Sequence, residues 1–131
     1  MTVGRWHASR ARGVMNPEKP QASNLPHHRL VGYQLAVELV RLIACTRIGE
    51  AQLRQQARKS AASAALNAAE AAARTSQGDK NRLFGIALAE ACEACAAVEI
   101  AGALGACAER DVAAVVALGV RVKNVVSRLI R

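Results

Sequence analysis

Polar residues recur at alternating intervals of four and three through the alanine-rich segment from Gln56 to Arg74. These intervals bring side chains onto one face of an α-helix, and alanine is the strongest helix former. The segment is therefore predicted to be a helix with one polar stripe, composed of Gln56, Ser60, Ser63, Asn67, Glu70 and Arg74. We interpret the stripe as a hydrogen-bonded seam between helices or subunits. A ligand or nucleic-acid contact surface and a merely solvated face are the alternatives.

Helical periodicity also marks three other segments of the chain. The four predicted helices cover about residues 30–45, 51–74 and 80–104, and a last segment that starts near 109. Asp79 is expected to be the N-cap of the third helix, and Gly105 fits its C-cap. The last segment is rich in valine, which favours strands, but its uninterrupted helical spacing outweighs that preference. Because short connections make consecutive helices antiparallel neighbours, the predicted fold is all-α, an antiparallel up-down-up-down four-helix bundle.

The apolar residues are mainly Ala, Val and Leu, and the aromatic residues are limited to Trp6, Tyr33 and Phe84. Burial of a Leu or Val side chain stabilises a fold by roughly 1.5–3 kcal/mol, whereas Ala contributes far less. A lone bundle of this composition is expected to be marginally stable. The composition therefore favours a homo-oligomer, in which further apolar surface is buried.

Two regions hold most of the excess positive charge, in a chain whose net charge is +8. Residues 1–26 are basic, contain three prolines and lack a helical period, so they are predicted to be a flexible tail before a bundle over 27–131. The candidate nucleic-acid-binding residues are three in the tail and four near the end of the last helix: Arg5, Arg10, Arg12, Arg121, Lys123, Arg128 and Arg131. Such a basic excess suits a polyanion. The alternative is charge that serves solubility and pairing between subunits.

No catalytic motif is present in the chain, which lacks a glycine-rich phosphate loop, an HExxH sequence and a nucleophile elbow. Cys92 and Cys95 form a CxxC pair, but it lies inside a predicted helix, without the second ligand pair of a structural zinc site. We expect small buried hydrophobic side chains there, no metal, no cofactor and no enzymatic activity. Because no apolar run reaches the ~18–20 residues of a membrane span and the N-terminus has no signal peptide, a cytoplasmic location with reduced cysteines is expected.

The second predicted helix resembles that of the four-helix-bundle proteins encoded in intervening sequences of bacterial large-subunit ribosomal RNA genes. Their pattern is similar to Q-x-R-R-A-A-x-S-I-x-x-N-I-A-E-G-x-x-R, and the third helix reads roughly F-L-x-I-A-x-G-S-x-x-E. Matching positions here are Gln56, Arg58, Lys59, Ala61, Ser63, Asn67, Ala69, Glu70, Arg74, Ile86, Ala87 and Glu93. Ala71 stands in place of the glycine after the glutamate, and Glu90 in place of the serine of the third helix. The seam for packing or assembly is assigned to Gln56, Arg58, Ser63, Asn67, Glu70, Arg74 and Glu93.

The resemblance covers about residues 28–131 and implies a four-helix bundle. The family is similar to the pentameric accessory protein of diversity-generating retroelements, a basic barrel that binds nucleic acid and a reverse transcriptase. By this analogy the expected assembly is a homopentamer. Its expected partner is nucleic acid, RNA or DNA, bound with low specificity through phosphates. The alternative is a structural adaptor that scaffolds a protein partner such as a reverse transcriptase.

Overall fold

Four helices make up most of the chain between residues 24 and 131, the part that the computed structural model describes. The helices are α2 (Val31–Cys45), α3 (Ala51–Ala73), α4 (Gln77–Ala103) and α5 (Glu109–Ser127). These bounds agree with the four predicted segments to within three residues at each defined end, and the all-α four-helix fold is confirmed. The prediction of a tail over 1–26 falls almost entirely outside the described residues.

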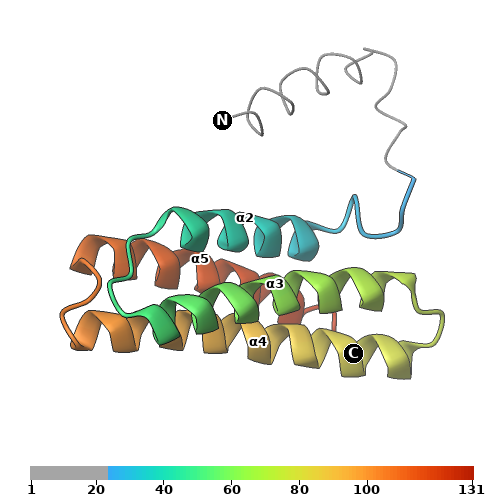
Figure 1. Cartoon of the computed structure of the whole chain (residues 1–131). Coiled ribbons are helices and arrows are strands. Elements are labelled where there is room, and N and C mark those ends of the chain that lie inside the picture. Colours follow the sequence, from blue (N-terminus) through green and yellow to red (C-terminus); the bar gives the residue numbers. More distant parts are fainter. Residues whose placement is uncertain (1–23) are drawn as a thin grey trace, which may run out of the picture.

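Each helix packs on the next along the chain, and α5 returns to pack on α2. Figure 1 shows successive helices running in alternate directions. The two connections at one end meet where the backbone N–H of Gly49 donates to the carbonyl of Ala106, at 2.7 Å. At the opposite end, the Asn81 side chain donates to the Arg131 carbonyl at 2.8 Å and accepts from its N–H at 3.1 Å. The C-terminal residue is thereby tied to the first turns of α4.

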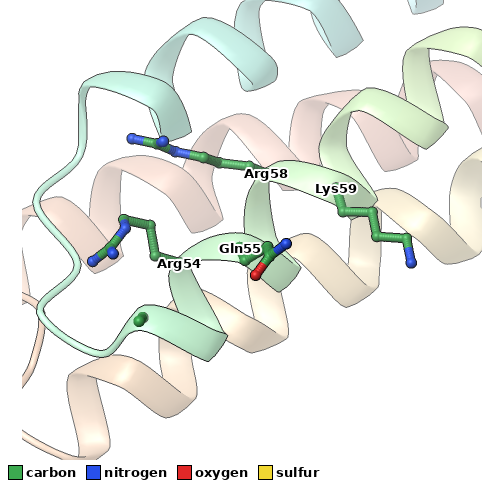
Figure 2. A pocket seen from close by; sticks show the side chains of 5 residues that line it. Arg54, Gln55, Arg58 and Lys59 are labelled. Atoms are coloured by element: carbon green, nitrogen blue, oxygen red, sulfur yellow. The ribbon is translucent and has the colours of Figure 1, made fainter.

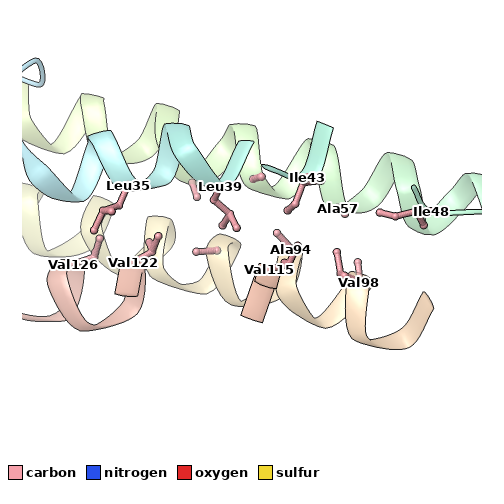
Figure 3. Packing of buried hydrophobic residues seen from close by; sticks show 14 of the residues in the cluster. Leu35, Leu39, Ile43, Ile48, Ala57, Ala94, Val98, Val115, Val122 and Val126 are labelled. Carbon is pink, nitrogen blue, oxygen red and sulfur yellow. The ribbon is translucent and has the colours of Figure 1, made fainter. Parts of the chain in front are cut away.

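Large side chains fill the centre of the bundle near α2 and α5, and alanines fill the space between α3 and α4. Figure 3 shows Leu35 and Leu39 of α2 directed towards Val122 and Val126 of α5. The buried residues of α3 are all alanines except Ser60. Small side chains let two helix backbones approach closely, but they bury little apolar area for each residue.

The helix ends correct one prediction and support another. The N-cap of α4 is Ser76, whose hydroxyl accepts from the Asp79 N–H at 3.1 Å, so the prediction that Asp79 caps this helix is wrong. The serine lies three residues earlier and satisfies an N–H that would otherwise lack a partner. Asp79 instead lies in the first turn, where the helix dipole favours a negative charge. Gly105 has φ +77° just after α4, as expected of a C-terminal glycine.

The α3 C-terminus has a cap that the sequence pattern does not indicate. The Nζ of Lys80, in the first turn of α4, donates to the carbonyls of Ala71 and Ala72 at 3.2 and 3.3 Å. The ammonium group gives the Ala72 carbonyl a partner and adds a second donor to the Ala71 carbonyl, which also accepts from the Arg74 N–H at 3.2 Å. This contact fixes the tight turn between the two helices.

Two glycines allow α4 and α5 to approach closely. A Cβ atom placed on Gly119 would lie 2.2 Å from the Cys95 Sγ, and one placed on Gly102 would lie 2.8 Å from a methyl group of Val112. Both distances are shorter than any normal van der Waals contact. None of the helices between residues 24 and 131 is both long and apolar enough to span a bilayer.

Candidate nucleic-acid interface

The predicted basic residues of the last helix are exposed and lie on two sides of α5. The buried line of this helix is Val115, Gly119, Val122 and Val126. Arg121 and Arg128 flank that line on one side, and Lys123 flanks it on the other. Arg131 follows the helix and is also exposed. No carboxylate among residues 24–131 forms an ion pair with any of the four.

The other three predicted nucleic-acid-binding residues, Arg5, Arg10 and Arg12, lie outside the described residues. The described chain begins with a turn in which the His28 N–H donates to the Leu25 carbonyl at 3.1 Å. The Gln34 side chain then donates to the His28 carbonyl at 2.7 Å, which ties this turn to α2. A hydrogen-bonded turn that is tied to α2 therefore precedes the first helix of the bundle.

A second group of basic side chains lies on the first half of α3, and only Arg58 among them was assigned a role from the sequence. They line an open hollow of about 540 Å³, here called the α3 basic hollow (Figure 2), whose lining residues are Ala51, Arg54, Gln55, Arg58 and Lys59. An adjoining hollow of about 320 Å³ shares Gln55 and Lys59. Residues 54–59 contain three basic residues and no acidic one, and this run is the sequence signal that could have revealed the cluster.

The polar seam connects two helices at one point. The Gln56 Nε2 donates to the Glu93 carboxylate of α4 at 2.6 Å and to the Ser60 hydroxyl at 2.9 Å. Ser60 is 1% exposed and is one of two buried polar residues in the described part of the chain. The fold therefore brings together Gln56 and Glu93, which lie 37 residues apart in the sequence. Arg58 belongs to a different contact, because its Nη2 donates to the Ala44 carbonyl of α2 at 3.3 Å.

The remaining seam residues bond within α3. The Asn67 side chain donates to the Ser63 carbonyl at 2.9 Å and lies 3.2 Å from its hydroxyl. Glu70 and Arg74 form an exposed ion pair one helical turn apart, and this pair raises the pKa of Arg74. Among residues 24–131, none of these four side chains forms a hydrogen bond or ion pair with another helix. A role for them between subunits stays a prediction.

The cysteine pair on α4 only partly matches its prediction. Cys95 is half-buried, and its thiol donates to the Val115 carbonyl with a sulfur–oxygen distance of 3.8 Å. Cys92 is exposed, so the prediction that both are buried hydrophobic side chains is wrong for this residue. Cys92 precedes Cys95 by three residues on α4 and lies further from the side of the helix that faces α5. Burial, with smaller contributions from Cys92 and Glu99, raises the pKa of the Cys95 thiol to about 11.

The described residues offer free thiols and exposed cations. Cys45 and Cys107 are also free thiols, and between residues 24 and 131 no three metal-ligating side chains gather. Because burial raises the pKa of Cys95, its thiol stays protonated near neutral pH. The arrangement offers exposed cations and hydrogen-bond donors on helices that pack against one another in the bundle.

These observations define an all-α four-helix-bundle protein with exposed basic residues that form no ion pair with the described carboxylates. The family model described as 23S rRNA-intervening sequence protein matches residues 30–128. The chain therefore belongs to this family, as the motifs of its second and third helices indicate. No curated protein matches the sequence.

Proposed function

We propose that the protein is a non-enzymatic accessory protein that binds nucleic acid, RNA or DNA, with low sequence specificity. The observation that carries this proposal is the set of four exposed cations at the end of α5, which form no ion pair with the described carboxylates. Contacts from Arg and Lys to phosphates supply sequence-independent affinity. The chain has few aromatic residues on which bases could stack, so contacts to the phosphate backbone account best for binding.

The proposed assembly is a homo-oligomer, and the resemblance described above favours a pentamer. Each basic surface would then be repeated around the symmetry axis, so that individually weak contacts add through multivalency. An adaptor function is the second candidate. Its support is the apolar surface on α3 and α4, where Leu66, Ile100 and Leu104 are exposed and available to a protein partner such as a reverse transcriptase.

The experiment that tests binding replaces Arg121 and Arg128 together by Glu. We expect wild-type protein to shift both RNA and duplex DNA in a gel at about 50 mM salt, and binding to weaken steeply as salt rises because neutralised phosphates release counterions. The double Glu variant should bind all sequences more weakly by a similar factor. Deletion of residues 1–26 should also weaken binding without altering the bundle.

The matched control is Arg121→Lys with Arg128→Lys, which keeps both charges and should bind nearly as tightly as wild type. Circular dichroism checks that each variant retains its helices. If wild-type protein forms no complex with either nucleic acid at about 50 mM salt, the adaptor function replaces this proposal.

A further inference from the structure

The α3 basic hollow combines two guanidinium groups, one ammonium group and glutamine amides on consecutive turns of one helix. Figure 2 shows Arg54 and Arg58 extending in one direction, towards the connection between α2 and α3, and Lys59 extending the other way. The hollow thus presents donors along the first half of α3. It lies at the opposite end of the bundle from Arg131, because Arg131 bonds to the start of α4.

Backbone carbonyls hold the two guanidinium groups in place. The Arg54 Nη1 donates to the Ile48 carbonyl at 2.8 Å, and the Arg58 Nη2 donates to the Ala44 carbonyl at 3.3 Å. A guanidinium group has five N–H donors, so each arginine keeps further donors after its structural contact. A donor that is already held in position loses less conformational entropy when a ligand binds.

The positive charge of this surface is not cancelled by the carboxylates of the same region. Glu50 is the N-cap of α3 and accepts from the Leu53 N–H at 2.7 Å, and Glu93 accepts from Gln56. Neither of them forms an ion pair with a described cation. The N-terminal end of the α3 dipole adds partial positive charge.

We infer that the α3 basic hollow is a second phosphate-binding site, which takes the sugar–phosphate backbone of a nucleic acid. Arginine and lysine beside neutral amide donors suit successive phosphate oxygens. The lining residues include no aromatic side chain, which excludes base stacking there. The inference rests on the proposed function and extends it: nucleic acid contacts both ends of the bundle, the α3 basic hollow at one and the cations of α5 at the other.

The test compares the double variant that combines Arg58→Gln and Lys59→Gln with the wild-type protein. The dissociation constant of each is measured by fluorescence anisotropy over a salt series. Removal of two phosphate contacts should reduce the slope of log affinity against log salt by about 1.4 for single-stranded RNA and about 1.8 for duplex DNA. The control is the double variant that combines Arg58→Lys and Lys59→Arg. It keeps both charges, so the slope of log affinity against log salt should stay close to the wild-type value. Lys59→Gln alone, at a residue with no side-chain hydrogen bond in the described structure, should reduce the slope by about half as much.

A second measurement does not depend on a charge change. Addition of a single-stranded RNA should shift the side-chain amide signals of Gln55 in a nitrogen–proton NMR spectrum. The corresponding signals of Asn67, which bonds within the second half of α3 and lies in neither proposed contact, should stay in place. Wild-type binding with an unchanged slope in the variants and no shift of Gln55 would overturn this inference and leave the proposed function standing. Absence of RNA and DNA binding by wild-type protein would overturn both.

Discussion

Residues of one polar stripe have different roles because their surroundings differ. Gln56 and Glu70 lie on the same face of α3 by their spacing, yet Gln56 bonds to a carboxylate on α4, whereas Glu70 pairs with Arg74 on the same helix in solvent. A hydrogen bond to a charged group contributes more to stability than a neutral one. Exposed ion pairs along a helix contribute little. The periodicity alone cannot distinguish these two environments.

At this scale we predict that Gln56→Ala lowers the free energy of unfolding by about 1 kcal/mol, because Glu93 and the buried Ser60 both lose a hydrogen-bond partner. Glu70→Ala should have little effect on stability. Urea unfolding at one fixed protein concentration measures both. Gln55→Ala, at the exposed neighbouring glutamine, is the matched control. Equal effects of the Gln55 and Gln56 variants would contradict the assignment of a stabilising seam at Gln56.

Whole helices approach one another at distances set by their smallest residues. In α3 and α4 these residues are alanines, and between α4 and α5 they are Gly102 and Gly119. The Cys95 Sγ fills the space where a Cβ of residue 119 would lie. The pair of helices is therefore expected to depend on the absence of a side chain at that position.

We predict that Gly119→Ala destabilises the protein by about 1–3 kcal/mol, the usual cost of an extra methyl group in a packed interior. The same substitution in a Cys95→Ala background should cost much less, because the obstructing sulfur is gone. Gly85→Ala is the control, since a Cβ there meets no atom within 4 Å and alanine favours a helix over glycine by roughly 1 kcal/mol. Additive effects of Gly119→Ala and Cys95→Ala in thermal unfolding would refute this account of the contact.

At the scale of the molecule, a single 13.8 kDa chain leaves large apolar side chains in solvent. Leu66 on α3 is 71% exposed and Leu104 at the end of α4 is 65% exposed. The alanine-rich interior between α3 and α4 buries little apolar area for each residue, so it contributes little to the stability of a single chain. Both features favour association with further copies of the chain.

The corresponding prediction is that light scattering finds a homo-oligomer, most simply a pentamer, at micromolar concentration. Ile100→Glu and Leu66→Glu each place a charge on exposed apolar surface, and the one that lies in the subunit contact should shift the mass towards the monomer. Glu99→Gln, which changes the charge at the exposed residue next to Ile100 without placing a charge on an apolar side chain, is the control. A stable wild-type monomer at this concentration would rule out the assembly.

Helix positions and fold class can be predicted from the sequence by itself. The helical spacing of the apolar residues decides which side chains share one face of a helix, whichever part of the protein that face contacts. The motifs around Gln56 and Glu93 are also local, and they were sufficient to indicate the family. The cap of α4 is local as well: Ser76-Gln77-Gly78-Asp79 has the S-x-x-D pattern of a capping box, and the Ser76 hydroxyl accepts from the N–H three residues later. Other features depend on three-dimensional neighbours.

Tertiary structure alone decided which member of each pattern is buried, bonded or free. Helical spacing places Cys92 and Cys95 near one another, but only the position of α5 buries one and exposes the other. The α3 basic hollow likewise depends on the carbonyls of Ala44 and Ile48, which the fold brings beside Arg58 and Arg54. Helical periodicity is a property of one segment, whereas burial and hydrogen bonding at these residues are properties of two segments in contact.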